Sequence, residues 1–216
     1  MRETIPMTGM VIKSTPVGEF DKRLVLLTRE RGKITAFARG AKRPGNMLMA
    51  PSRPFAFGIY RLLEGRDAYN LQSAEITNYF EGLSQEVELS CYGQYFLEFA
   101  DYYSRENLDG SGMLLLLYQT LRALLKPQIP NPLIRRIFEL KAMVLNGEYS
   151  EYPPEKVSDS AAYTWEFVTL SPLESLYTFT VTDSVLKEFS RCVEINKSRY
   201  MDREFYSLEV LKTMVN

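Results

Sequence analysis

The chain has 216 residues, a formal net charge of −1, 45% hydrophobic residues, two cysteines and no histidine. This composition can fill a folded core, but no stretch approaches the roughly 20 apolar residues of a membrane helix, and the start lacks a signal-peptide pattern, so we expect a cytoplasmic protein. Without histidine the chain lacks the most common general base near neutral pH and the most common zinc ligand, so most classes of enzyme are not expected.

The first eighty residues contain short runs of strand-forming residues separated by turn signals. The five runs are Met10–Lys13, Arg23–Thr28, Lys33–Arg39, Phe55–Arg61 and Tyr69–Gln72. Five strands at this spacing predict a small closed or nearly closed barrel, because closure removes exposed sheet edges. We therefore expect an OB-fold domain over residues 1–80, with an SH3-like barrel as the alternative.

The hydrophobic period changes from two to about 3.6 after residue 80. Helices are predicted from Ser84 to about Ser104, over Met113–Lys126, from Asn131 to about Gly147, from the capping box Ser171–Glu174, from Thr182 to about Arg199 and over Ser207–Met214. Residues 148–160 have no periodicity and are predicted to form an exposed loop. The expected fold class is α+β, with the barrel at residues 1–80 followed by an all-α domain at residues 81–216.

Positive charge is concentrated in the predicted barrel. Residues 1–80 hold 13 Lys and Arg against 7 Asp and Glu, a net of +6, whereas residues 81–216 carry −7. Such asymmetry indicates a domain that binds a polyanion. The alternative is that these cations are ordinary solvated surface charges that bind no ligand.

One strand shows how cations and a ring combine. Successive strand residues point to opposite faces, so Lys33, Phe37 and Arg39 share a face with Thr35. Cations that pair with phosphates, beside a ring on which a base stacks, suit single-stranded nucleic acid. The alternative is a solvated face with Phe37 packed against a neighbour.

The third predicted helix combines an apolar side that includes Phe138 with the cations Arg135, Arg136 and Lys141. A pocket of this composition could accept an acidic peptide that ends in an aromatic residue and a free carboxylate. The alternative is an ordinary amphipathic helix in which Arg135 pairs with Glu139 four residues on.

Motifs for catalysis or metal binding are missing from the sequence. The acidic segment from Glu148 to Asp159 has no EF-hand spacing, and the chain has no phosphate-binding loop of the Walker type and no nucleophile elbow. We expect no catalytic residue, no metal and no cofactor.

Several segments together resemble the RecO family. In the barrel they are Gly18–Lys22, Gly32–Ile34, Gly40–Arg43, Arg53–Phe55 and Ala74–Glu75; in the helical part they are Phe138–Lys141 followed by Gly147, and Ser171–Glu174 followed by Phe179. No single motif is specific, but their order and spacing cover most of the chain. The resemblance implies an OB-fold and a helical domain that bind single- and double-stranded DNA, anneal complementary strands and help to load recombinase onto coated strands.

The resemblance also implies partners and site residues. The implied partners are DNA, RecR and the acidic C-terminal tail of single-stranded-DNA-binding protein, in a bacterial protein associated with the nucleoid. The implied DNA-binding residues are Lys22, Lys33, Arg39, Lys42 and Arg43 first, then Arg23, Arg29, Arg31, Arg53 and Arg66. The strand pattern described above adds Phe37 as the stacking ring. The tail is expected at Arg135, Arg136, Phe138 and Lys141.

This chain departs from the family pattern at one place. Many members carry a four-cysteine zinc motif after the third helix, whereas residues 148–160 contain no cysteine. Zinc is therefore not expected. The alternative function is an RNA-binding or protein-interaction scaffold of the same fold without annealing activity, and a metal-dependent nuclease is a third class.

Overall fold

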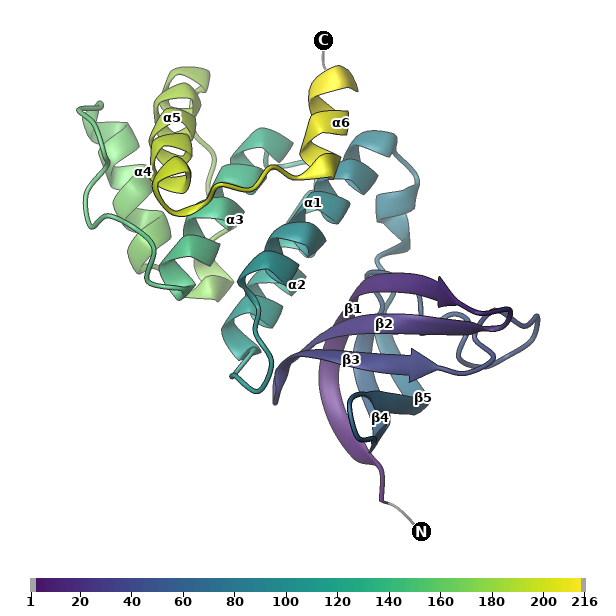
Figure 1. The fold of residues 1–216 in the computed structure, drawn as a ribbon. Helices are drawn as coiled ribbons and strands as arrows, with labels where there is room; N and C mark the ends of the chain where they lie inside the picture. Colours follow the sequence, from purple (N-terminus) through teal and green to yellow (C-terminus); the bar gives the residue numbers. More distant parts are fainter. Residues whose placement is uncertain (1–2, 215–216) are drawn as a thin grey trace. The chain divides into compact units, whose positions relative to one another are not determined.

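Five strands close into a barrel in the computed structural model, which describes residues 3–214 (Figure 1). The strands are β1 (Ile5–Val17), β2 (Asp21–Thr28), β3 (Gly32–Ala38), β4 (Phe57–Glu64) and β5 (Tyr69–Asn78). Their order around the barrel is β1-β2-β3-β5-β4, with β3 and β5 parallel and the other pairs antiparallel. The predicted OB-type barrel is confirmed, and β1 is much longer than the predicted run.

The barrel interior follows from the alternation of side chains along the strands. In β3, Ile34, Ala36 and Ala38 are buried, whereas the residues between them are half-buried. Leu24 and Leu26 of β2 join the same core. The predicted alternation along β3, with apolar side chains inside and Lys33, Thr35 and Phe37 on the outer side, is therefore confirmed.

The barrel unit includes a segment from later in the chain. One compact unit comprises the residues up to Glu81 together with Ala100–Leu114, and the other comprises Gly82–Phe99 and the residues from Leu115 onward. Three backbone hydrogen bonds hold this later segment to the turn between β2 and β3 and to the start of β3. They join Lys33 N to Arg105 O at 3.0 Å, Asn107 N to Arg31 O at 3.0 Å, and Gly110 N to Arg29 O at 3.1 Å.

Gly32 makes this close contact possible. Its φ is +60°, and a Cβ at this position would lie 2.3 Å from the carbonyl oxygen of Arg105. Only a residue without a side chain fits both the left-handed backbone and the close approach.

The second unit is helical. Its helices are α1 (Val87–Tyr103) and α2 (Ser111–Leu124), each of which also contributes to the barrel unit, and α3 (Asn131–Leu145), α4 (Asp159–Leu170), α5 (Asp183–Tyr200) and α6 (Tyr206–Met214). Two short 3-10 helices, η1 (Glu81–Ser84) and η2 (Leu173–Ser175), complete the elements. The predicted barrel followed by helices is confirmed.

Three predicted helix starts differ from the structure. Ser84 belongs to η1, and α1 begins at Val87. The N-cap of α3 is Pro130, without a side-chain bond, instead of Asn131. Ser171 is the C-cap of α4, so the predicted capping box opens only the short η2.

Helix α4 was not among the predicted helices. Ser158 caps its N-terminus, where its side chain accepts a bond from Ala161 N. Trp165, fully buried, packs its ring against Phe189 of α5 with 6.5 Å between ring centroids.

Within residues 3–214, no helix combines the length and the hydropathy needed to cross a bilayer.

Candidate nucleic-acid interface

The outer surface of β1, β2 and β3 carries the side chains that the sequence predicts for nucleic acid. Arg23 lies directly opposite Phe37 in the antiparallel register, and Thr15 lies opposite Arg23 on the other side. Arg23 is exposed and Phe37 is half-buried. Directly opposed residues of adjacent strands lie within side-chain contact range, so this row places a cation beside a ring.

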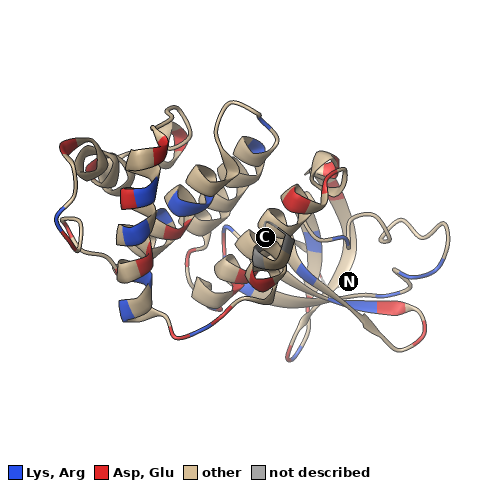
Figure 2. Ribbon diagram, turned by 90° about the horizontal axis from the view of Figure 1, so that it is seen from above, with Lys and Arg blue, Asp and Glu red and all other residues tan. Residues whose placement is uncertain are grey.

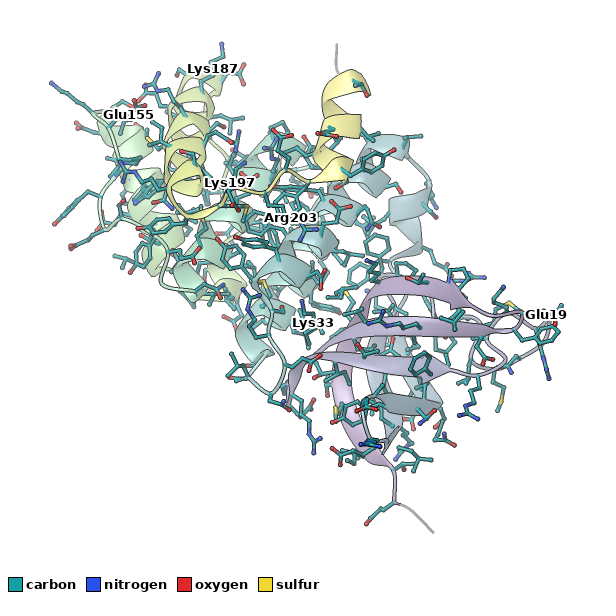
Figure 3. All side chains as sticks on the ribbon, in the orientation of Figure 1. Glu19, Lys33, Glu155, Lys187, Lys197 and Arg203 are labelled. Carbon is teal, nitrogen blue, oxygen red and sulfur yellow. The ribbon has the colours of Figure 1, made fainter. Side chains whose placement is uncertain are left out.

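The loop after β3 is held against the turn between β1 and β2. Gly40 N donates to Asp21 Oδ1 at 2.7 Å, and Lys42 N donates to Phe20 O at 2.9 Å. The amine of Lys42 donates to Gly18 O at 3.3 Å. These bonds hold a cationic loop at one end of the barrel, where Glu19 also lies (Figure 3).

We give the name cationic face to five exposed cations, one from β2 and four from the residues between β3 and β4. Its members are Arg23, Arg39, Lys42, Arg43 and Arg53. Among residues 3–214, no carboxylate lies within 4.0 Å ion-pair range of any of them. Figure 2 shows the Lys and Arg positions along the strands and loops of the barrel.

Lys22 lies near this face but in a less polar setting. Burial and the positive charge of Arg53 lower the pKa of its amine. A phosphate bound nearby would restore the stability of the charged form, because an opposite charge favours ionisation.

Other predicted cations are already paired within the barrel unit. Arg31 forms an ion pair with Glu64 at 2.7 Å and donates to the hydroxyl of Tyr69. Lys33 donates to Asp101 Oδ1 at 2.9 Å and to Asp101 O at 2.8 Å (Figure 3 labels Lys33). The structure therefore separates Arg31 and Lys33 from the unpaired cations.

The remaining two predicted cations, Arg29 and Arg66, are exposed and lie in other turns, before β3 and between β4 and β5. Hydrogen bonds from Ser111 lower the pKa of Asp109, and the charge of Arg29 adds to this effect. Arg29 thus has the Asp109 carboxylate in its surroundings, although the two do not form an ion pair within 4.0 Å.

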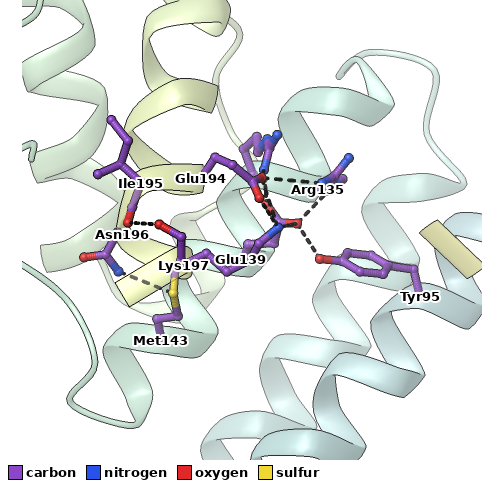
Figure 4. Close-up of polar contacts among 10 residues, drawn as sticks. Tyr95, Arg135, Glu139, Met143, Glu194, Ile195, Asn196 and Lys197 are labelled. Carbon is purple, nitrogen blue, oxygen red and sulfur yellow. Dashed lines mark hydrogen bonds and ion pairs between the residues drawn. The ribbon is translucent and has the colours of Figure 1, made fainter. Parts of the chain in front are cut away.

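The predicted partner-binding cations on α3 face a buried carboxylate (Figure 4). Glu139 has no exposed surface, and it accepts bonds from Arg135 Nε at 2.9 Å and from an Arg136 nitrogen at 2.7 Å. Lys197 lies 3.7 Å from it, and Tyr95 donates its hydroxyl. The pair between Arg135 and Glu139, which was predicted for an ordinary amphipathic helix, is therefore present.

Burial opposes the ionisation of Glu139, but the charges of Arg136, Arg135 and Lys197 outweigh it and lower its pKa to about 2. Arg136 also pairs with Glu194 at 2.7 Å. The arginines are thus occupied by carboxylates, which leaves little capacity for a further one.

Phe138 and Lys141 are also directed inward. Phe138 is fully buried, with its ring centroid 4.6 Å from that of Phe96. The Lys141 amine donates to Thr169 O at 2.9 Å and to Ser171 O at 2.6 Å, at the C-terminal end of α4. Phe138 cannot line an open groove here, and Lys141 binds the last carbonyls of a helix, where a cation is favourable.

The start of the segment 148–160, which was predicted to be an exposed loop, is held by hydrogen bonds. Asn196 is buried; its amide donates to Glu148 O at 3.0 Å, and its Oδ1 accepts from Ser150 N at 3.2 Å. Trp165 Nε1 donates to Ser150 O at 3.1 Å. Within the described part of the chain, no group of three or more Cys, Asp or Glu side chains is arranged to hold a metal ion.

Sequence reasoning left out one exposed ring at the loop end of the barrel. The Cζ atom of Arg43 lies 4.3 Å from the centroid of the Phe20 ring. The signal was available in the sequence, because Phe20 is an aromatic residue between two predicted strands and lies two positions before Lys22.

Comparisons with known proteins match two consecutive parts of the chain. Residues 1–80 match the family model described as Recombination protein O N terminal, and residues 84–151 match Recombination protein O C terminal. Similar proteins include three named DNA repair protein RecO. That of Alkaliphilus metalliredigens is 32% identical over 168 residues, 76% of this chain and 67% of the relative. That of Acetivibrio thermocellus is 23% identical over 241 aligned residues, 96% of each chain. That of Bacillus subtilis is 31% identical over 143 residues, 66% of this chain and 56% of the relative.

Proposed function

The chain belongs to the RecO family of recombination and DNA repair proteins, and we propose that it is a recombination mediator that binds DNA through the cationic face of its barrel. The observation that carries this proposal is that five exposed cations there have no carboxylate partner within residues 3–214. Phosphates of either single- or double-stranded DNA could pair with them, because such contacts do not depend on base sequence.

Annealing of complementary strands follows from the same chemistry. Two strands repel each other through their phosphates, and a surface that neutralises phosphates without reading bases lowers this repulsion and leaves the bases available for pairing. We extend the proposal to loading of recombinase onto coated strands together with RecR, in the cytoplasm at the nucleoid. No catalytic step is part of it.

An annealing assay tests the proposal. We expect the protein to accelerate pairing of complementary strands with and without magnesium, and to do so on strands coated with the cognate single-stranded-DNA-binding protein. Lys42→Ala/Arg43→Ala should slow annealing, whereas Lys187→Ala, which removes one exposed cation of the helical unit, should not. Magnesium-dependent cleavage would indicate a nuclease instead, and binding of RNA without annealing would indicate the scaffold alternative.

We also propose the acidic tail of single-stranded-DNA-binding protein as a partner, but at a different position from α3. An apolar cavity of about 660 Å³ lies between α4 and the segment before α5, with Phe167, Phe179 and Val181 among its lining residues. A neighbouring cavity that shares Phe179 contributes the cations Arg122 and Lys126. This combination suits a peptide with a terminal aromatic ring and a carboxylate.

A labelled tail peptide distinguishes the two positions. Arg122→Ala/Lys126→Ala should weaken binding of the peptide. Arg135→Ala should leave the affinity unchanged, because Arg135 is already paired with Glu139. If Arg135→Ala, shown by circular dichroism to be folded, weakens binding of the peptide and Arg122→Ala/Lys126→Ala does not, the docking site lies on α3.

A further inference from the structure

The turn between β1 and β2 exposes apolar side chains at the cationic end of the barrel. Phe20 is 38% exposed, Val17 is 40% exposed, and Met47 in the facing loop is 85% exposed. Single exposed apolar residues are common, but here three occur in two segments joined by hydrogen bonds. The arrangement thus places exposed apolar surface next to positive charge.

The ring of Phe20 is held in a defined position. The backbone carbonyl of Phe20 accepts a hydrogen bond from Lys42 N at 2.9 Å, and the carboxylate of the next residue, Asp21, accepts one from Gly40 N at 2.7 Å. The Arg43 guanidinium carbon lies 4.3 Å from the ring centroid, within the range of a cation–π contact. The turn thus presents a ring and a cation together, with little ordering left to occur on binding.

A nucleobase is the ligand that this pair suits. A base offers a flat apolar face to the ring, and the phosphates on either side of it offer negative charge to Arg43 and Lys42. Both faces of a base in a duplex are already stacked, so an exposed ring can stack only on an unpaired base. Phe37, which is half-buried on the outer face of β3, offers a second ring for the same strand.

We infer that Phe20, with Arg43 over its ring, is a base-stacking site for single-stranded DNA at the turn between β1 and β2. The inference rests on the proposed function, because it requires that DNA binds the cationic face. It adds that part of the affinity comes from bases and not from phosphates. It also predicts a preference for single over double strands that the cations alone do not give.

Binding of a single-stranded oligonucleotide and of a matched strand with abasic sites tests the inference. Phe20→Ala should weaken binding of the normal strand by about 5- to 150-fold, as expected for one lost stacking contact, and should leave binding of the abasic strand unchanged. The slope of log K against log salt should stay as in the wild type, because no phosphate contact is lost.

Two further variants serve as controls. Ile59→Ala removes an apolar side chain of similar exposure, 40%, from β4, and should not change either affinity. Phe20→Trp keeps an aromatic surface, so it should keep the affinity, and its fluorescence should be quenched by the normal strand and not by the abasic one. Trp165, the other tryptophan of this variant, is fully buried and gives a constant background.

Each other outcome overturns the inference. Equal weakening of both strands by Phe20→Ala would show that the ring only positions Arg43. Unchanged binding of both strands, with a normal salt slope, would leave DNA binding in place and remove Phe20 from it. If the wild type binds no DNA, but Phe20→Ala weakens binding to vesicles of anionic lipid, both the proposed function and this inference are wrong.

Discussion

The cations of the barrel and those of α3 differ in what surrounds them, although both groups are rich in arginine. On the cationic face, none of the five cations has a carboxylate in ion-pair range within the described residues. On α3, Arg135 and Arg136 surround Glu139, which has no exposed surface.

This difference separates two uses of positive charge. A cation that already has a buried carboxylate stabilises the fold, and its removal leaves an uncompensated charge. A cation without one can bind a polyanion from outside at little cost to stability. The net charge of each region indicates where a polyanion could bind. The ion pairs of each cation identify which cations are available to bind it.

Removal of the buried carboxylate should have the largest effect. Glu139→Gln keeps the size of the side chain but leaves Arg135, Arg136 and Lys197 with only the half-exposed Glu194. We expect the free energy of unfolding of the helical unit to fall by about 3–5 kcal/mol. Urea unfolding followed by the fluorescence of Trp165, the only tryptophan, measures this change.

Glu155→Gln provides the control in the same unit. Glu155 pairs with Arg191, whose side chain is 59% exposed, so its loss should cost less than about 1 kcal/mol. Similar losses for both variants would contradict the distinction between buried and exposed pairs.

Acid should remove part of the same stabilisation. The pKa of Glu139 is about 2 in the folded protein against an ordinary value of 4.5. A lowered folded pKa means that the stabilisation is complete above pH 4.5 and is lost as the pH falls toward 2. This loss amounts to about 3 kcal/mol. Unfolding measured from pH 6 to 2 should show a smaller acid-dependent loss in Glu139→Gln than in the wild type.

On the barrel, the salt dependence of DNA binding should change before stability does. Lys42→Ala/Arg43→Ala removes two phosphate contacts, so the slope of log K against log salt should flatten by about 1.4 for single strands and about 1.8 for duplexes. The unfolding midpoint should barely move, because both residues are exposed. An unchanged slope and affinity would exclude this loop from the DNA site.

The smallest effect is expected for a barrel cation that already has a partner. Lys33→Ala removes the pair with Asp101, in which the side chains are 26% and 31% exposed, and should cost at most about 1 kcal/mol of stability. The salt slope should stay unchanged within error. A slope that flattens as much per charge as in the loop variant would show that DNA displaces Asp101 from Lys33.

Much of the barrel could be predicted because its local patterns agree with its topology. The alternation in β3 assigns Ile34 and Ala36 to the core and Phe37 to the outside, as the structure shows. Pairing between distant residues could not be predicted in this way. The bond from Lys33 to Asp101 joins residues 68 apart in sequence, and no short pattern encodes it.

The helical unit shows where local reasoning fails. Residues 159–170 form α4 although Thr164, Thr169 and Val168 are weak helix formers, because burial of Trp165 and Val168 outweighs propensity. The i,i+4 spacing of Arg135 and Glu139 predicted a pair, but the burial of Glu139 and its third cation, Lys197, depend on packing against α5.

The segment Ala100–Leu114 has a consequence for synthesis on the ribosome. The chain emerges from the N-terminus and domains generally fold as units in that order. Here the turn between β2 and β3 and the start of β3 obtain three of their backbone partners from Arg105, Asn107 and Gly110. All five strands will therefore have emerged some thirty residues before these three partners do. During this interval Gly32 and its neighbours are uncovered, and they offer a short-lived surface that a chaperone could bind and that the mature protein lacks.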